Sequence, residues 1–212
     1  MKALLFPVFF LSLFLSGTAP SPTPQATTKS VGRQGAVAGP IALGDLRKFL
    51  KHMAVIEVDD GMGGTYTTIQ IHDANLQIVN GSGATDGLVD GLGNLIVGYN
   101  ELRTSGNFRS GSHNLVVGKE HNFSSFGGLV AGKGSTVSGA HASVSGGRDN
   151  TASGDYASVS GGYSNTASGY QSSVSGGSGN TASGFGSSVS GGTNRSALGD
   201  DDWVAGTLFE DN

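Results

Sequence analysis

Single apolar residues recur at a fixed interval through the second half of the chain, and small polar residues flank each of them. The segments NTASGDYASVSGGYS, NTASGYQSSVSGGSG and NTASGFGSSVSGGTN follow one another from Asn150, each 15 residues long. The valine column continues toward the C-terminus by one more step of 15, and toward the N-terminus by steps of 15, 14 and finally 20. The column comprises Ile96, Val116, Val130, Val144, Val159, Val174, Val189 and Val204. Disordered Gly/Ser linkers keep no such register, so the pattern predicts a folded repeat.

Two short strands are predicted in each repeat, because successive side chains of a strand face opposite ways. The valine of S-V-S and the alanine of T-A-S point inward. The alanine column is Ala152, Ala167, Ala182 and Ala197. The serines beside the valines then form an exposed ladder of Ser143, Ser145, Ser158, Ser160, Ser173, Ser175, Ser188 and Ser190. The fold class predicted is all-β, a parallel β-solenoid or β-roll of 14- and 15-residue coils.

Glycine and asparagine are expected to form the sharp corners between these strands. A glycine follows each valine of the column by two residues, and glycine adopts positive φ without steric cost. The corner column comprises Gly98, Gly118, Gly132, Gly146, Gly161, Gly176, Gly191 and Gly206. Asn150, Asn165 and Asn180 suit the same role, because asparagine tolerates the left-handed conformation.

One valine and one alanine per late coil bury little apolar surface for 15 ordered residues. The corner aromatics Tyr156, Tyr170 and Phe185 are one source of further packing, and a core shared by several chains is another. The first coils favour assembly, because apolar residues stand on both faces of their strands and the outer face needs a cover. These outward residues are Leu95, Val97, Leu115, Val117 and Leu129. The N-terminal segment and neighbouring subunits are the two candidate covers.

The segment before the repeat predicts a short helix followed by a hairpin. Asp45 is expected to cap the helix. The apolar face of the helix consists of Leu46, Phe49, Leu50 and Met53. AVIEV and TYTTIQI flank DDGMGG, an arrangement typical of a β-hairpin. We expect both elements to cap the solenoid and protect its open edge, and Trp203 to close the far end.

The N-terminus has the three parts of a secretory signal peptide. Lys2 precedes an apolar core from Ala3 to Leu15, and small residues follow at Gly17 and Ala19. The predicted organisation is a signal peptide at 1–19 (with a cut as late as 26 as an alternative), a flexible leader at 20–40, a helix-and-hairpin cap at 41–92, the β-roll at 93–206 and a tail at 207–212. We therefore expect a secreted or cell-surface protein, with the periplasm as an alternative.

Composition and charge exclude several classes of partner. The net charge of −4 and the lack of a basic patch give no reason to expect nucleic acid. The chain has no cysteine, so no disulfide framework is available. No later segment is apolar enough for an integral membrane span in the mature chain.

The motifs NLIVG, NLVVG and GLVAG, with the TASG…SSVSGG series, resemble the head repeats of trimeric autotransporter adhesins, the YadA-like group. The resemblance covers Gly93 to Gly206. It implies a left-handed parallel β-roll in which three chains pack side by side, and adhesion to host or matrix through broad surfaces. The repeat here settles at 15 residues with serine beside the valine, and neither the coiled-coil stalk nor the β-barrel anchor of that group follows it.

GGLVAGKGST, residues 127–136, comes within one position of the phosphate-binding loop G-x-x-x-x-G-K-[ST]. Gly134 stands where that loop has serine or threonine. The repeat explains Gly132 as a corner glycine, and Lys133 follows its corner as Lys119 does one coil earlier. STVSGAHASVSGG continues in short strands, whereas a phosphate loop leads into a helix. Nucleotide binding is therefore not predicted.

No other catalytic, metal or cofactor motif is predicted. Asp59 and Asp60 lack the spacing of a calcium loop and are expected to form a turn. The serines lack the nucleophile elbow of hydrolases. The histidines are expected to be solvated, and they are His52, His72, His113, His121 and His141.

These observations predict an exported, non-enzymatic, adhesin-like or structural surface protein. It is expected to be a homotrimer that presents a rigid Ser/Thr-rich β-roll to an unidentified host, matrix or surface ligand. The alternative is an ice-binding (antifreeze) solenoid, because the S-x-S ladders and the column Thr151, Thr166 and Thr181 repeat hydroxyl groups on flat faces. Serine in place of threonine removes the methyl group that such faces use.

Overall fold

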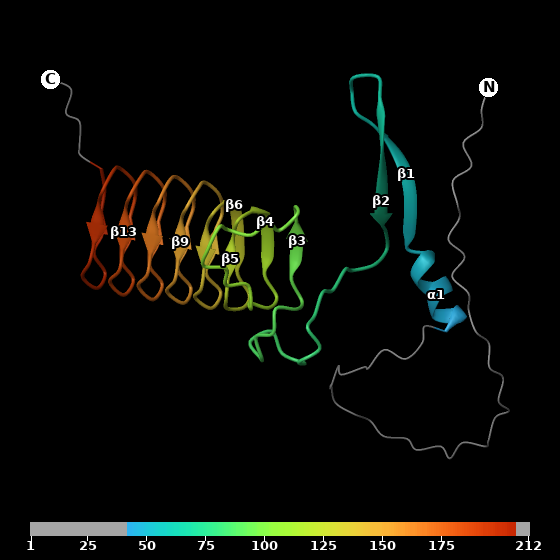
Figure 1. Cartoon of the computed structure of the whole chain (residues 1–212), viewed down its shortest axis with the longest axis horizontal. Helices are drawn as coiled ribbons and strands as arrows, with labels where there is room; N and C mark the ends of the chain where they lie inside the picture. Colours follow the sequence, from blue (N-terminus) through green and yellow to red (C-terminus); the bar gives the residue numbers. More distant parts are fainter. Residues whose placement is uncertain (1–41, 207–212) are drawn as a thin grey trace, which may run out of the picture. The chain divides into compact units, whose positions relative to one another are not determined.

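The computed structural model describes residues 42–206 of the chain. The predicted signal peptide, leader and tail lie outside the described residues. Within 42–206 the chain forms a helix with a hairpin, and a solenoid of stacked coils (Figure 1).

The helix and the hairpin are present as predicted. Helix α1 spans Leu43–Leu50, and strands β1 (Met53–Asp59) and β2 (Thr65–Ile71) pair antiparallel. Ala42 is the N-cap residue of α1 and makes no side-chain cap, so the expectation that Asp45 caps the helix is wrong. Asp45 lies in the first turn instead, where a carboxylate suits the helix dipole. None of the residues of α1 is buried.

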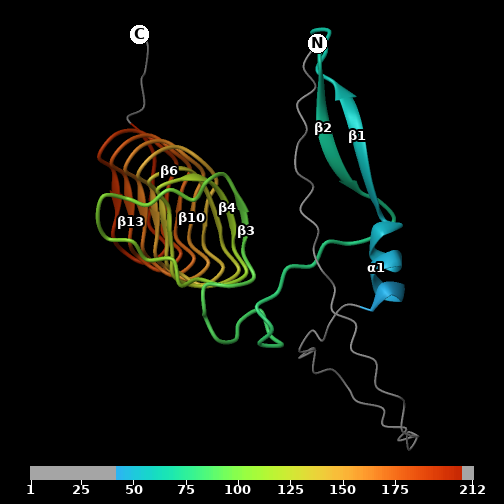
Figure 2. The ribbon, with the colours of Figure 1, turned by 45° about the vertical axis from the view of Figure 1, so that its right-hand side comes forward.

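Two parallel sheets form the solenoid, which confirms the predicted fold class (Figure 2). The strands with the inward valines form an eight-stranded sheet, here the Val sheet: β3 (Leu95–Val97), β4 (Leu115–Lys119), β6 (Leu129–Lys133), β8 (Ser143–Val144), β10 (Ser158–Val159), β12 (Ser173–Val174), β14 (Ser188–Val189) and β16 (Trp203–Val204). The other six form the Ala sheet: β5 (Asn122–Phe123), β7 (Thr136–Val137), β9 (Thr151–Ala152), β11 (Thr166–Ala167), β13 (Thr181–Ala182) and β15 (Ser196–Ala197). Corner 1 is the turn from a Val-sheet strand to the Ala sheet, and corner 2 is the turn back.

The core is a narrow stack between the two sheets. The rung residues Val116, Val130, Val144, Val159, Val174 and Val189 are at most 1% exposed, and Ala152, Ala167, Ala182 and Ala197 are fully buried. Ile96 and Val204 occupy the same column, in the two edge strands of the Val sheet. Ile96 is 38% exposed, because only β4 pairs with its strand.

The coil lengthens from 14 to 15 residues in corner 1. Leu129 pairs with Ser143, whereas Lys133 bridges to Arg148. One residue is therefore added after Val144. Gly132 consequently lies against Gly147, whose carbonyl oxygen would be 2.2 Å from a Cβ on Gly132. The predicted corner column, which continued from Gly132 to Gly146, is wrong at this step because the added residue shifts the register of the corner.

A ladder of buried asparagines follows corner 1. Asn150, Asn165 and Asn180 are fully buried. The Nδ2 group of Asn165 donates to the carbonyl oxygens of Gly161 (2.9 Å) and Gly177 (3.0 Å), and its Oδ1 accepts the backbone N–H of Asn180 (3.0 Å). The expectation that the asparagines themselves form the corners is wrong. The residue before each one takes the left-handed conformation, as Ser164 does with φ 52°.

Candidate functional site

Rows of hydroxyl groups cover the outer surfaces of both sheets in the later coils. On the Val sheet, the eight predicted ladder serines share one face: Ser145, Ser160, Ser175 and Ser190 are exposed, and Ser143, Ser158, Ser173 and Ser188 are half-buried. On the Ala sheet, half-buried Thr136, Thr151, Thr166 and Thr181 lie beside exposed Ser138, Ser153, Ser168 and Ser183. The parallel register places each hydroxyl next to its equivalent in the neighbouring coil, at the strand spacing of about 4.8 Å.

The outer surface of the Val sheet is apolar in its first three strands. Leu95, Leu115 and Leu129 pair with one another in successive strands, and Val97 pairs with Val117. These five residues are here called the apolar patch. Leu95 is 43% exposed, Val97 53% and Leu115 39%, while the other two are half-buried. Within residues 42–206 of this single chain, the patch therefore remains accessible to solvent.

Corner 1 stacks three cationic side chains in successive coils. Lys119 pairs with Lys133, which bridges to Arg148. The Glu120 carboxylate lies 3.8 Å from the Nζ of Lys119 and 3.7 Å from that of Lys133. The guanidinium carbon of Arg148 lies 4.5 Å from the ring centroid of Tyr163, within the range of a cation–π interaction. These charges are paired on the surface, where each pair stabilises little.

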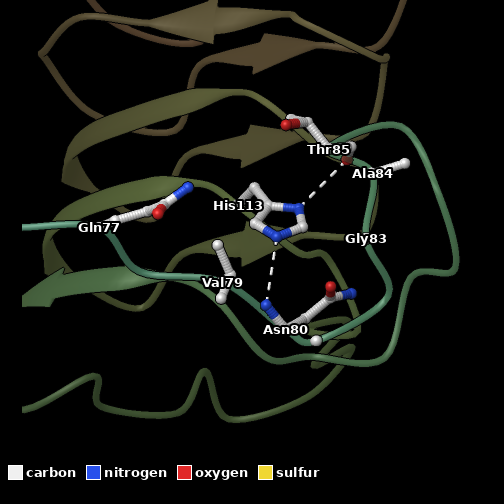
Figure 3. Close-up of a pocket in the computed structure, with 8 residues that line it drawn as sticks. Gln77, Val79, Asn80, Gly83, Ala84, Thr85 and His113 are labelled. Carbon is white, nitrogen blue, oxygen red and sulfur yellow. Dashed lines mark hydrogen bonds between the residues drawn. The ribbon is translucent and has the colours of Figure 1, made fainter. Parts of the chain in front are cut away.

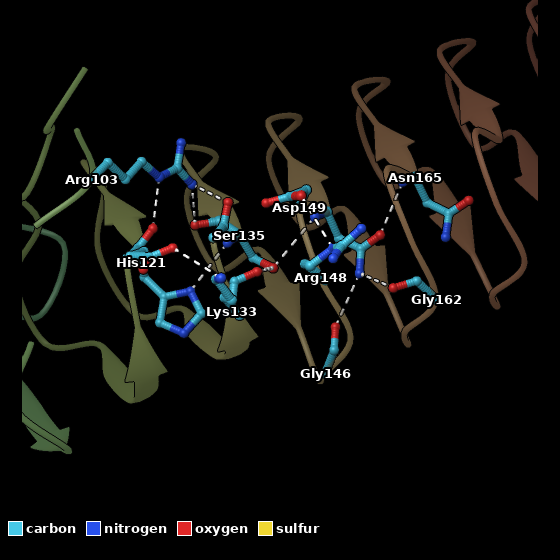
Figure 4. Close-up of polar contacts among 12 residues, drawn as sticks. Arg103, His121, Lys133, Ser135, Gly146, Arg148, Asp149, Gly162 and Asn165 are labelled. Carbon is cyan, nitrogen blue, oxygen red and sulfur yellow. Dashed lines mark hydrogen bonds and ion pairs between the residues drawn. The ribbon is translucent and has the colours of Figure 1, made fainter. Parts of the chain in front are cut away.

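A buried arginine fastens the loop after β3 to corner 1 (Figure 4). The Nε of Arg103 donates to the carbonyl oxygen of Glu120 (2.6 Å), and its Nη2 donates to the Ser135 carbonyl (2.9 Å) and to Thr136 Oγ1 (3.0 Å). The planar guanidinium thereby serves several acceptors at once, a geometry that lysine lacks. A polar hollow of about 310 Å³ lies beside it, and Glu120 and Asp149 are among the residues that line it.

His121 is 1% exposed, so the expectation that all five histidines are solvated is wrong for this residue. Its Nδ1 accepts the backbone N–H of Ser135 (3.2 Å), which identifies Nε2 as the protonated nitrogen of a neutral ring. Nε2 in turn donates to the Val117 carbonyl oxygen (3.1 Å). Burial lowers the pKa of His121 below its usual value.

We expect the free energy of unfolding to decrease as the pH falls below about 6.5. The unfolded chain binds a proton at His121 near that pH, whereas the folded chain, with its lower pKa, does not. Stability is thus fully present above the unfolded pKa and declines until the folded pKa is reached. Urea unfolding of the wild type and of His121→Gln, between about pH 7.5 and 5, measures the difference.

The control for this measurement is His141→Gln, a substitution at an exposed position. His121→Gln should flatten the pH dependence, while His141→Gln should leave more of it in place. An unchanged slope in His121→Gln would contradict the assignment of the proton-linked loss to this ring.

Corner 2 carries a continuous row of aromatic rings, here the aromatic column, which consists of Phe126, His141, Tyr156, Tyr170 and Phe185. Successive ring centroids are 5.2, 5.5, 5.4 and 5.3 Å apart. His141 and Tyr156 are stacked, as are Tyr170 and Phe185, and edge-to-face contacts join these pairs to each other and to Phe126. Sequence reasoning identified three of the rings as corner packing and missed Phe126 and His141. Their 15-residue spacing to Tyr156 was the available signal.

The ring of His113 anchors the segment before the solenoid to its first coils (Figure 3). Its Nε2 accepts the backbone N–H of Asn80 (3.2 Å), and its Nδ1 lies 3.1 Å from the Thr85 carbonyl oxygen. The hollow around the ring measures about 110 Å³ and is also lined by Gln77 and Val79. Because both ring nitrogens are occupied, His113 serves the docking of residues 77–85.

The two aspartates of the hairpin tip perform turn chemistry. Asp59 Oδ1 accepts the N–H of Gly61 (2.7 Å), and Asp60 Oδ1 accepts those of Met62 (2.7 Å) and Gly64 (2.9 Å). These backbone donors lower the pKa of Asp60. In the part of the chain that the structure describes, no three His, Cys, Asp or Glu side chains are grouped as for a metal ion.

Trp203 lies on the outer face of the Val sheet and not across its end, where it was expected. It pairs with Ser188 in the outward column, and its Nε1 donates to Ser190 Oγ (2.8 Å). Trp203 is 68% exposed. The alternation of the strand explains the difference, because Val204 takes the inward position.

The wider comparisons add no relative. No helix among residues 42–206 has the length and apolar character to cross a membrane. No protein-family model matches the chain, and searches of curated proteins and of solved structures found no match.

Proposed function

We propose that this chain is an exported, non-enzymatic surface protein, adhesin-like or structural, that presents the hydroxyl-covered faces of its β-solenoid for adhesion or surface assembly. The observation that carries the proposal is the register of the exposed serines on a backbone held by parallel ladders and buried asparagines. Many equivalent weak contacts along such a rod combine into strong attachment through multivalency. The resemblance to adhesin head repeats, at NLVVG and GLVAG above all, points the same way.

We propose further that three copies assemble. The apolar patch supports this, because burying it against other copies removes a contiguous apolar surface from water. The helix supports it as well: Leu43 is 65% exposed, Phe49 58% and Leu50 54%. An eight-residue helix with an exposed apolar face gains stability by packing against its equivalents.

The solution mass of the secreted chain tests the assembly. Light scattering should give three chain masses for the wild type, and a smaller species for Val97→Asp, which places a charge in the apolar patch. Ser175→Asp, on the same sheet outside the patch, is the matched control and should remain trimeric. A wild type that is monomeric at micromolar concentration would rule the trimer out.

Attachment is tested with beads that carry the secreted chain on surfaces coated with extracellular-matrix proteins. Replacing the four exposed Val-sheet serines (Ser145, Ser160, Ser175 and Ser190) by glutamate should weaken attachment. The same replacement of Ser138, Ser153, Ser168 and Ser183 on the Ala sheet is the control. Attachment that survives both replacements, or a wild type that does not attach, would overturn the role of the serine face.

The second candidate is ice binding, and the Ala sheet favours it. There a column of four threonines stands in register beside a column of four serines on one face. Thermal hysteresis and ice-crystal shaping by the wild type, lost in Thr166→Tyr, would support this function. Their absence at millimolar protein would eliminate it.

A further inference from the structure

We propose that the aromatic column of corner 2 binds a linear, uncharged polysaccharide that lies along the solenoid axis. The inference rests on the proposed adhesive function and adds to it a ligand class and a binding site. It is carried by the spacing, exposure and surroundings of the five rings.

The rings form a continuous surface whose repeat suits a chain of sugars. Consecutive centroids are 5.2–5.5 Å apart across five coils. An extended polysaccharide repeats on a similar scale, and the C–H faces of sugars pack on aromatic rings. Tyr156 is 52% exposed, Tyr170 44% and Phe185 50%. About half of each ring is thus held by its neighbours, and the other half is available to a ligand.

Hydroxyl groups border the column on both sides. Exposed Ser153 and Ser168 stand just before corner 2, at the end of the Ala-sheet strands, and half-buried Ser158 and Ser173 stand just after it. Aromatic surface edged by hydroxyl donors and acceptors is the combination that recognises sugars, which offer an apolar face and a rim of hydroxyl groups.

The charges near corner 2 select against anionic ligands. Asp155 and Asp200 lie in this corner, where each carboxylate accepts a backbone N–H, from Ala140 (2.8 Å) and Phe185 (3.0 Å) respectively. Asp201 and Asp202 follow directly in the last coil. The stacked lysines and the arginine of the solenoid stand in corner 1 instead. Anionic glycans would therefore meet like charge, and an uncharged glycan would not.

The rings stay in line although the backbone positions that supply them change. His141 (φ 55°) and Tyr156 (φ 59°) stand in the left-handed position of corner 2, a costly conformation for a bulky residue. In the next two coils Gln171 and Gly186 take that position, and the ring comes from the preceding residue. The Tyr156–Tyr170 centroid distance of 5.4 Å remains that of the other steps. What is maintained is the position of the ring on the surface.

Calorimetric titration of the secreted chain tests the ligand class. The probes are the soluble hexasaccharides of chitin and cellulose, and hyaluronan oligosaccharides of similar length as the anionic comparison. We expect an uncharged hexasaccharide to bind and the anionic one not to bind. Failure of both uncharged probes at millimolar concentration, or preference for hyaluronan, would overturn the proposal. If the beads still attach to matrix in that case, the proposed adhesive function stands and only the glycan site is refuted.

Two tyrosines of equal exposure provide the matched variants. Tyr170 in the column and Tyr163 in corner 1 are both 44% exposed. Tyr170→Ala should weaken binding about tenfold and Tyr170→Phe much less, while Tyr163→Ala should leave it unchanged. Phe185→Leu, which keeps the apolar volume without the ring, should also weaken binding while thermal unfolding shows an intact fold. Equal losses in Tyr170→Ala and Tyr163→Ala would contradict a site in the aromatic column.

Discussion

Replacing Gly162 by alanine should destabilise the solenoid by roughly 3 kcal/mol or more. A Cβ at this position would lie 2.2 Å from the carbonyl oxygen of Gly177 in the next coil and 2.6 Å from the Nδ2 of Asn165. The φ of +89° adds strain for any residue with a side chain. Neither coil can retreat without breaking the ladder hydrogen bonds on both sides. Urea unfolding followed by circular dichroism measures the loss.

The neighbouring glycine is the control for this substitution. A Cβ on Gly161 would contact nothing within 4 Å, and its φ lies outside the left-handed region. Gly161→Ala should therefore be neutral, or stabilising by up to about 1 kcal/mol through the unfolded state. Equal effects of the two substitutions would show that the coils are not in close contact at Gly162.

Replacing Asn165 by alanine should also cost roughly 3 kcal/mol or more, because each buried polar group left without a partner costs about 1–3 kcal/mol. The substitution removes the donor to the Gly161 and Gly177 carbonyls and the acceptor of the Asn180 N–H. Thermal and urea unfolding should both show the loss. Ser168→Ala, an exposed substitution in the same coil, should change stability by less than about 0.5 kcal/mol.

An aspartate at the same position separates hydrogen bonding from side-chain volume. Asn165→Asp keeps the shape and the acceptor, but at neutral pH it directs a carboxylate at two carbonyl oxygens. We expect its folded-state pKa to be raised, so the deficit relative to wild type should shrink as the pH falls and the carboxyl group is protonated. A fully stable Asn165→Asp at neutral pH would contradict the hydrogen-bond roles assigned to this ladder.

The fold was predictable because strand alternation leaves a direct trace in the sequence. Val159 and Ala167 are the apolar residues of their strands, and small polar residues flank both, so their burial and the parallel stacking follow. The buried asparagines were not predictable in the same way. Asparagine beside glycine is typical of an exposed turn, and its burial depends on how closely one corner packs against the next.

His121 shows how a change of coil length hides a column. Ser135 and Asn150 occupy the equivalent positions in the next two coils, since His121 accepts the Ser135 N–H and Ser135 Oγ lies 3.4 Å from the Asn150 nitrogen. The three residue types differ and their spacing changes from 14 to 15, so no periodic pattern marks them as one ladder.

The candidate site was partly predictable. The serine and threonine rows follow from alternation alone. The aromatic column does not, because its rings come from Tyr156 and then from Tyr170, one residue earlier in the coil. A search at a fixed repeat position finds Gln171 instead. Only the geometry of corner 2 shows that rings from two backbone positions meet in one line.

Both departures from the regular coil fall in corner 1. One is the residue added after Val144, and the other lies between Gly98, which meets the Gly118 carbonyl, and Phe108, which donates to Asn122. The ladders of both sheets continue past each insertion. Corner 1 is thus a point where foreign peptides are tolerated, and loops grafted there in successive coils would be displayed as an array with the spacing of the strands.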